Sequence, residues 1–575
     1  MINFEAATPG APAQTLIDDQ VASRIHAKDS NLFNFSENAQ LFARDFMGWT
    51  TLASEPPLAL SEIQNFADSL IARGLKTVVL VGQGGSTQAP MTLTKYNKAD
   101  SSLISFKTID SVSPVRVRAI MSECDPKTTL VIHSSKSGST IEPHTIMQAV
   151  MAIMREKLSQ EELYNHLVAI TDPGSDLEKR AKEEGWLRVF TGEPSVGGRY
   201  SALSVFGLLP AALAGINLNA LMRSAARAEM LCSSDSVDNP ALVLASFLYE
   251  NYVQGRNKFA FLSPKRGRVL GLWIEQLVAE SLGKEGEGIL PNIETDSLTL
   301  SEDTKDRTAI IYETKTDLFD ERLNYYQSLE FLNPDIPRIT FKVENVIDLA
   351  GHFVMWEYAI AMVGYLMEIC PFDQPDVQAA KTEVLRILEE GGEAPHFTQN
   401  GLAGVPVGEI EVHVSEALED SLVDETVSGA ITALCRSIEP GDYFSLNAFL
   451  PFTGEGRREA LEEIRHSIAE RCRIPSCLEI GPRYLHSTGQ LHKGGPNCGV
   501  FLILSADELK DIPLKQEAES LGSLAKAQAS GDLVTLAERG RRVVHLHLPD
   551  NSGVTLRQLA EVISDILETM TVPTA

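Results

Sequence analysis

The feature that most constrains the fold of this chain is a short apolar run that ends in a turn of glycine and hydroxyl residues. One such run, residues 77–81, leads into the turn GQGGST at residues 82–87, and a second, residues 129–133, leads into SSKSGST at residues 134–140. Helical patterns separate these runs from several others of the same kind. Apolar runs that alternate with helices are typical of parallel strands buried on both faces of a sheet. The sequence therefore predicts an α/β chain built on doubly wound parallel sheets.

The length of 575 residues leaves room for three or four domains of ordinary size. Residues 1–57 are too few for a domain, and we expect an N-terminal lead-in with one or two helices. The pattern predicts a first parallel-sheet domain over residues 58–225 and a second of the same type over residues 226–390. A C-terminal α/β or α+β domain is expected over residues 391–575. Its first part, residues 391–408, has the glycine and proline density of a linker.

Charge and cysteine content narrow the possible partners and location. The chain carries 78 acidic and 50 basic side chains, a formal net charge of −28. A broad surface for nucleic acid or for an anionic membrane needs clustered cations, so we expect neither partner, and any anionic ligand must be held in a local pocket. The seven cysteines form no CxxC pair, and the N-terminus lacks the features of a signal peptide. These features indicate reduced thiols and a cytoplasmic protein.

The two polar turns fit a phosphate group better than a dinucleotide. A dinucleotide fingerprint would need a third glycine at position 87, where Thr87 stands. Glycine backbone N–H groups and hydroxyl donors at a helix N-terminus can hold a phosphate anion. An ordinary strand-to-helix turn is the alternative for the first turn, whereas the second has far more hydroxyls than a helix cap requires. The predicted phosphate-binding residues are Gly85, Ser86, Ser135, Lys136, Ser137 and Thr140.

Three further motifs follow the two turns: GGRYS at residues 197–201, QLVAESLGK at 276–284 and FDQPDVQAAK at 372–381. In this order the five blocks resemble the sugar isomerase (SIS) domain and, more narrowly, the phosphoglucose isomerase family. The resemblance implies two SIS domains, a homodimer, and interconversion of glucose 6-phosphate and fructose 6-phosphate in glycolysis and gluconeogenesis without a cofactor. The lead-in and the C-terminal third resemble the isomerase half of bacterial transaldolase/phosphoglucose isomerase fusions, although the lead-in is too short for a transaldolase barrel.

The chemistry of an aldose–ketose isomerase assigns roles to these motifs. One base must remove a proton from one carbon and return it to the next, and Glu280 suits this role, with Gln276 one turn earlier on the same helix face. An enediolate intermediate is negatively charged, and Arg199 in its Gly-Gly turn can stabilise that charge. The resemblance implies that Lys381 assists ring opening and that Gln374 contacts the substrate. The structural alternatives are an exposed helix glutamate, a surface arginine and a solvated lysine.

The histidine that members of this family use for ring opening is missing from the loop at residues 331–337. His352 begins a predicted helix and is interpreted as a capping or packed histidine. The polar, glycine-rich run at residues 481–496 contains His486 and His492. His492 follows a Gly-Gln pair and precedes a lysine, which favours the neutral imidazole. We predict that His492 is the ring-opening group, with His486 as the reserve.

Two alternatives to this function remain open from the sequence. A non-catalytic sugar-phosphate sensor needs the phosphate turns alone, and an isomerase of a mannose or amino-sugar phosphate differs in wall residues that the sequence does not place. His545 and His547 alternate along a predicted strand, but no third ligand accompanies them. We therefore predict no metal site.

Overall fold

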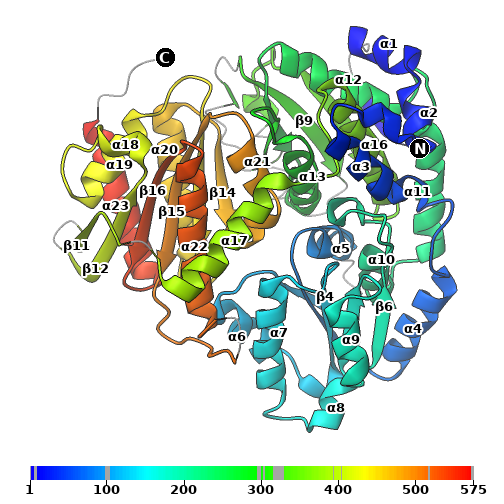
Figure 1. Ribbon diagram of the computed structural model, residues 1–575, viewed down its shortest axis with the longest axis horizontal. Coiled ribbons are helices and arrows are strands. Elements are labelled where there is room, and N and C mark those ends of the chain that lie inside the picture. The colour runs from blue at the N-terminus through cyan, green and yellow to red at the C-terminus, as the bar shows by residue number, and fades with distance from the viewer. Residues whose placement is uncertain are drawn as a thin grey trace.

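The computed structural model describes residues 2–5, 10–97, 104–293, 300–301, 305–314, 325, 329–392, 394–402, 405–515 and 518–570. These residues form three lobes, each built on one sheet, and the parallel sheet cores confirm the predicted α/β class (Figure 1). None of the described helices combines the length and the apolar character that crossing a bilayer requires.

The first lobe contains a five-stranded sheet in the order β3-β2-β4-β5-β6, and all neighbouring pairs are parallel. Its strands are β2 (Thr77–Gly82), β3 (Ser105–Ile109), β4 (Thr129–Ser134), β5 (Leu167–Thr171) and β6 (Arg188–Thr191). The helices of this part of the chain are α4 (Leu60–Ala72), α5 (Gly85–Tyr96), α6 (Pro114–Ser122), α7 (Ile141–Met154), α8 (Gln160–Tyr164), α9 (Asp176–Glu183), α10 (Val205–Leu213) and α11 (Leu218–Cys232).

Strand β2 shows why an uninterrupted apolar run is needed at this position. Val78 and Leu80 belong to the large core shared with the second lobe, whereas Val79 and Val81 belong to a separate core on the opposite face of the sheet. Successive side chains of a strand point to opposite faces, so a strand covered by helices on both sides must be apolar at every position.

The second lobe has the strand order β1-β10-β9-β7-β8, in which only β1 is antiparallel to its neighbour. The strands are β1 (Asn3–Glu5), β7 (Lys258–Leu262), β8 (Leu290–Asn292), β9 (Arg307–Thr314) and β10 (Arg338–Val343). The helices are α12 (Pro240–Val253), α13 (Arg268–Leu282), α16 (Leu349–Leu366) and α17 (Pro375–Glu390).

The N-terminal segment contains more structure than the sequence predicts. It supplies edge strand β1 of the second sheet and the helices α1 (Ala11–Asp18), α2 (Val21–His26) and α3 (Glu37–Phe46). Helix α1 packs on α12 and α2 packs on α16, so this segment adds to the second lobe (Figure 1). The predicted boundaries of the lead-in and of the three domains stay a prediction.

The C-terminal lobe has the strand order β11-β12-β16-β15-β13-β14. The pairs from β16 to β14 are parallel, while β11 and β12 form an antiparallel edge, so this lobe is α/β with an added hairpin. Its strands are β11 (Phe397–Leu402), β12 (Val405–Val414), β13 (Tyr443–Phe449), β14 (Ser476–Ile480), β15 (Gly499–Ala506) and β16 (Arg542–Leu548). Its helices are α18 (Glu416–Glu419), α19 (Val427–Arg436), α20 (Arg457–Cys472), α21 (Gly489–Gly494), α22 (Leu521–Glu538) and α23 (Gly553–Thr569).

The prediction of a linker at residues 391–408 was wrong for much of its length. Phe397 begins strand β11 and pairs with Val412. Its side chain and that of Leu402 are buried in the core of the C-terminal lobe, so this segment is part of the lobe and not a linker. Glycine and proline here mark the turns around an edge hairpin.

Helix α17 joins the first lobe to the C-terminal lobe. It crosses the centre of the molecule alongside α22 (Figure 1). Val384 and Ile387 of α17 and Leu521 and Leu524 of α22 belong to the same core as Val79 of β2. The position of α17 relative to the first sheet is therefore fixed by shared apolar packing.

We expect Gly531→Ala to lower the melting temperature. In an ordinary helix interior alanine is more stable than glycine by about 1 kcal/mol. At Gly531 an added Cβ would lie 2.9 Å from Cγ2 of Val384 on α17, and overpacking of this kind costs roughly 1–3 kcal/mol. Thermal melts of Gly531→Ala, Val384→Ala and the double variant should show that Val384→Ala relieves part of the cost. A higher melting temperature for Gly531→Ala would contradict this close packing.

Candidate functional site

The two polar turns lie side by side at one edge of the first sheet. Strands β2 and β4 are hydrogen-bonded neighbours, with Gly82 opposite Ser134, so the residues that follow each strand share that edge. From β2 the chain crosses first to β3 on one side and then to β4 on the other. Ligands of open α/β sheets bind at such a point of reversal, beyond the carboxyl ends of the strands.

The first turn makes close contact with other predicted segments. Gly84 has φ = +52°, and a Cβ there would lie 2.8 Å from Gln276 Nε2 and 3.3 Å from His486 Cβ. A Cβ on Gly85 would lie 1.9 Å from the carbonyl oxygen of Gly198. Glycine is required at these positions because the backbone at His486 and at Gly198, together with the side chain of Gln276, lies against the turn. Ser86 is buried in the first turn of α5.

Glu280 and Arg199 form a buried pair. Glu280 lies near the end of α13, and Arg199 belongs to the 3₁₀ helix η4 (Gly198–Tyr200). Arg199 Nη1 is 3.6 Å from Glu280 Oε2, and the two side chains are only 3% and 8% exposed. Gln276 donates from Nε2 to the same carboxylate oxygen at 3.3 Å. Arg199, Gln276 and Glu280 thus meet as the motifs predict.

Burial raises the pKa of the Glu280 carboxyl, and the charges of Arg199, His486 and Lys284 offset only part of this rise. The carboxylate is therefore a stronger base than an exposed glutamate, yet it stays next to a permanent cation. A carboxylate with these properties can remove a proton from carbon and give it back.

The FDQ motif holds Arg199 in place. Arg199 Nη2 donates to the carbonyl oxygens of Pro371 and Asp373 at 2.6 and 2.9 Å, and Nη1 donates to Gln374 Oε1. Lys284 donates to the carboxylate of Asp373 at 2.6 Å and to its carbonyl oxygen at 2.8 Å. This part of the motif therefore orients the arginine, which accounts for the placement of Gln374 at the start of α17.

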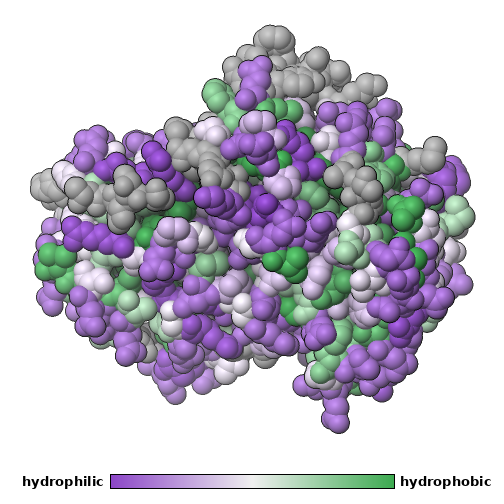
Figure 2. Space-filling model, turned by 90° about the horizontal axis from the view of Figure 1, so that it is seen from above, coloured by the Kyte–Doolittle hydropathy of each residue, from purple (hydrophilic) through white to green (hydrophobic). Residues whose placement is uncertain are grey.

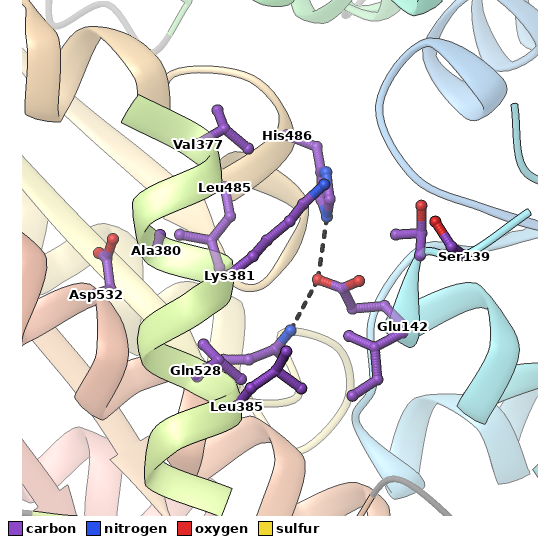
Figure 3. Close-up of a pocket in the computed structure, with 13 residues that line it drawn as sticks. Ser139, Glu142, Val377, Ala380, Lys381, Leu385, Leu485, His486, Gln528 and Asp532 are labelled. Atoms are coloured by element: carbon purple, nitrogen blue, oxygen red, sulfur yellow. Dashed lines mark hydrogen bonds and ion pairs between the residues drawn. The ribbon is translucent and has the colours of Figure 1, made fainter. Parts of the chain in front are cut away.

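A cavity of about 260 Å³ lies between α7, α17, α22 and the 3₁₀ helix η6 (Arg483–His486) (Figure 3). Lys381 and His486 point toward Glu142 across it, and Ser139 and Thr140 line the opposite wall. The cavity brings the second polar turn, the lysine of the fifth motif and a histidine of the C-terminal lobe together.

His486 is oriented by a carboxylate. Its Nε2 lies 3.0 Å from Glu142 Oε1, and the same oxygen accepts a hydrogen bond from Gln528 Nε2 at 2.8 Å. Burial alone would raise the pKa of Glu142, but the charge and hydrogen bond of His486 and the charge of Lys381 outweigh it and lower that pKa. Glu142 is therefore an anion that can fix the orientation of the imidazole ring.

In the second polar turn the hydroxyl groups are available to a ligand, whereas the lysine is held by other residues. Ser135 Oγ is buried and has no hydrogen-bond partner among the described residues, and Ser137 Oγ lies 3.5 Å from Thr140 Oγ1 at the start of α7. Lys136 turns away: its ammonium group pairs with Asp172 and donates to Glu193 O and Pro194 O at 3.3 and 3.4 Å. The structure does not bring Lys136 to the cavity because these acceptors hold it.

The structure places His492 away from the cavity. Its ring packs between Tyr443, Tyr484 and Phe501, with centroids 6.0, 5.9 and 5.0 Å away, and it is 1% exposed. Burial, followed by the charges of Lys493 and Arg541, lowers its pKa well below the ordinary value. The neutral form expected from the neighbouring lysine is thus favoured, but in an aromatic core.

The other histidines have structural partners. His352 is packed in the second lobe, with Nδ1 3.1 Å from the hydroxyl of Tyr312, as its interpretation as a packed histidine implies. His545 and His547 both lie 2.8 Å from Ser505 Oγ. Within the described ranges no group of three or more His, Cys, Asp or Glu residues could hold a metal ion.

Two contributors to the site carry little sequence signal. Glu142 is noticeable only as an acidic residue at a helix start, and Gln528 lies within α22 far along the chain. The contact of His486 with Glu142 joins residues 344 positions apart, and only the packing of the two lobes brings them together.

Comparisons with known proteins agree with this geometry. A family model described as Phosphoglucose isomerase matches residues 68–314. The glucose-6-phosphate isomerase of Mycoplasmopsis pulmonis (strain UAB CTIP) is 28% identical over 423 residues, covering 66% of this chain and 98% of that protein. The glucose-6-phosphate isomerase of Prochlorococcus marinus (strain MIT 9301) is 27% identical over 446 residues, covering 69% and 83%.

Two solved structures share the fold. A hypothetical protein of Thermus thermophilus has a TM-score of 0.56 at 24% identity, covering 66% of this chain and 98% of that one. A glucose-6-phosphate isomerase of Chlamydia trachomatis has a TM-score of 0.53 at 18% identity, covering 68% and 89%. The family model and the relatives confirm the resemblance found in the sequence: the chain is similar to phosphoglucose isomerases over about two thirds of its length.

Proposed function

We propose that the chain interconverts glucose 6-phosphate and fructose 6-phosphate through an enediolate, as an enzyme of glycolysis and gluconeogenesis. The family match and the relatives named glucose-6-phosphate isomerase support this reaction. The observation that carries the proposal is the buried Glu280 carboxylate held 3.6 Å from the buried guanidinium of Arg199. A non-catalytic sensor needs a phosphate site alone and is not favoured.

In this proposal Glu280 is the base. It takes the proton from C2 of the aldose and returns it to C1, while the oxygens of C1 and C2 share the negative charge of the enediolate. Arg199 stabilises that charge, and it does so without reorganisation because four hydrogen bonds already fix its guanidinium. Gln276 holds the carboxylate on the helix face that meets the substrate.

Ring opening requires a proton at the ring oxygen and removal of one from the anomeric hydroxyl. We assign these transfers to Lys381 and His486, which share the cavity, with Glu142 orienting the imidazole. His486 replaces the sequence-based prediction of His492, which the structure buries among aromatic rings.

The phosphate group is assigned to the second turn. Ser135 supplies a buried hydroxyl with no partner among the described residues, Ser137 and Thr140 supply two more, and the N-terminus of α7 adds backbone N–H groups. Gly85 and Ser86 shape the neighbouring wall. Lys136 acts indirectly, since its pairing with Asp172 ties the turn to the following strand.

Two finer points complete the proposal. A homodimer follows from the family resemblance, and a cytoplasmic location follows from the cysteine pattern and the N-terminal sequence. The likeness of the C-terminal third to the isomerase half of transaldolase fusions stays a prediction.

We expect Glu280→Gln to lower kcat about 10²- to 10⁴-fold in a coupled assay with fructose 6-phosphate, since the amide cannot act as a base. The acid limb of the wild-type pH–rate profile should lie above the ordinary glutamate pKa, because burial raises the pKa of Glu280 and the rate falls as it is protonated. Glu275→Gln, on the same helix and equally buried, is the control and should keep most of the activity. Near wild-type turnover by Glu280→Gln would remove Glu280 from the mechanism.

Replacing Ser135, Ser137 and Thr140 together with alanine should mainly raise KM. Phosphate contacts lie far from the reacting carbons and are largely common to the ground and transition states. Initial rates over a range of fructose 6-phosphate concentrations measure this. An unchanged KM would place the phosphate elsewhere.

We expect His486→Ala to slow turnover of ring-closed fructose 6-phosphate and to spare proton exchange on a sugar-phosphate analogue that cannot cyclise. The imidazole acts on ring oxygens and not on the carbon-bound proton. His492→Ala is the matched comparison, and it should lower the melting temperature without distinguishing the two substrates. The reverse outcome would return the role to His492.

A further inference from the structure

A second cavity, of about 510 Å³, shares no lining residue with the cavity of Figure 3. Strand β3, α5 and α6 of the first lobe form one wall, and the segment from η5 (Lys265–Gly267) into α13 forms another. Strand β14, α20 and η6 of the C-terminal lobe complete it. We refer to it as the cationic cavity. On the face of the molecule seen in Figure 2, hydrophilic side chains predominate, with scattered apolar ones among them.

The lining of the cationic cavity is strongly biased toward positive charge. Two acidic side chains, Asp110 and Glu123, face seven cations, each of which comes from a different helix or strand. The cations are Lys95, Lys107, Arg116, Lys265, Arg268, Arg458 and Arg483. This concentration stands out in a chain whose formal net charge is −28.

Both carboxylates of the lining contact cations of the same lining. Lys107 pairs with Glu123, and Arg483 Nη1 lies 3.7 Å from Asp110 Oδ2. Outside the cavity wall, Glu462 contacts Arg458 at 2.8 Å. Among the side chains that line the cavity, seven cations stand against two carboxylates, so the lining itself carries an excess of positive charge.

The pKa of Arg268 reflects this crowding. Burial and the charges of Arg458, Arg483 and Arg465 lower that pKa to about 10, against the opposing effect of Glu462. Like charges held this close in a partly buried site repel one another, and an anion between them would relieve that repulsion.

Arg116 offers a donor to such an anion. Its Nε is buried without a hydrogen-bond partner among the described residues, and its guanidinium lies 4.9 Å from the ring centroid of Phe452. A buried donor of a charged group is expensive to leave unsatisfied.

The remaining wall is apolar. Phe106, Leu272 and Phe452 line the cavity together with Leu478 and Ile480 of β14. An inorganic anion would use only the charged wall, whereas an organic anion could bury an apolar group against these side chains.

We propose that the cationic cavity binds an organic anion that carries two or more phosphate groups, at a site separate from the isomerase site. Several cations suit several phosphates, and the apolar wall suits a base or another flat group of the same molecule. The site shares η6 and α13 with the isomerase site, since Arg483 lines the cationic cavity and His486 lines the other.

The probes are ATP and inorganic tripolyphosphate, titrated calorimetrically in magnesium-free buffer with saturating fructose 6-phosphate to occupy the isomerase site. We expect one ATP per chain under these conditions, and at least about tenfold weaker binding of tripolyphosphate, which has no apolar part. Loss of ATP binding when fructose 6-phosphate is present would overturn the proposal, and so would equal binding of the two probes.

The variants separate the two sites. Lys95→Gln with Lys265→Gln removes two cations from the rim, and Arg116→Gln removes the buried donor; each should weaken ATP binding about tenfold or more. The control, Lys76→Gln with Lys157→Gln, changes two exposed lysines outside the cavity and the same net charge, and should bind ATP like the wild type. Equal weakening by the control pair would show non-specific charge attraction and refute the site.

The proposal can fail independently of the isomerase function. The variant with alanine at Ser135, Ser137 and Thr140 should bind ATP normally without any added sugar phosphate. Reduced ATP binding by that variant would move the anion to the isomerase site and overturn the inference, whatever the outcome of the fructose 6-phosphate assay.

Discussion

The guanidinium of Arg199 is the group on which the geometry of the site depends. It donates to Ser281 on α13, to two backbone carbonyls of the segment before α17 and to Gln374, and it faces Glu280. Burying an arginine is costly unless its donors are satisfied, so these partners must adopt one arrangement for the chain to fold. The contacts that stabilise the buried Arg199 guanidinium thus also position Glu280, the proposed base. The same contacts therefore account for both the local stability and the geometry of the site.

The site needs all three lobes because each supplies a group that the others lack. The first sheet gives the hydroxyl turn and Glu142, α13 of the second lobe gives Glu280, and the C-terminal lobe gives His486 and Gln528. Helix α17 connects them, since its buried face belongs to a core shared by β2 and α22 while Lys381 lines the cavity. A shift of the C-terminal lobe alone would separate His486 from Glu142 and leave in contact the Glu280–Arg199 pair, whose members belong to the other two lobes.

The strands and turns that depend on a local residue pattern are well predicted by the sequence. Strand β2 is apolar at every position because both faces are covered, and the glycines of its turn are required by backbone contacts, so both are visible along the chain. The choice between His486 and His492 was not predictable in this way. His486 and His492 lie six positions apart in one polar run. Helix η6 lies against α7, whereas α21 lies against an aromatic cluster, and only this packing distinguishes a cavity residue from a core residue. The direction of the Lys136 side chain was likewise not predictable, because it depends on an ion pair with Asp172, which follows the neighbouring strand β5.

The overall acidity of the chain has little influence inside its cavities. Charges in water are screened over about 8 Å at physiological ionic strength, so a phosphate group responds to the nearest donors and cations rather than to a net charge of −28. The two cavities use different means of holding an anion. In the proposed isomerase site, hydroxyls and a helix N-terminus hold the phosphate, and this modest set of donors suits a substrate that must leave after each turnover. The cationic cavity concentrates seven cations around an apolar wall, an arrangement suited to retaining a more highly charged molecule.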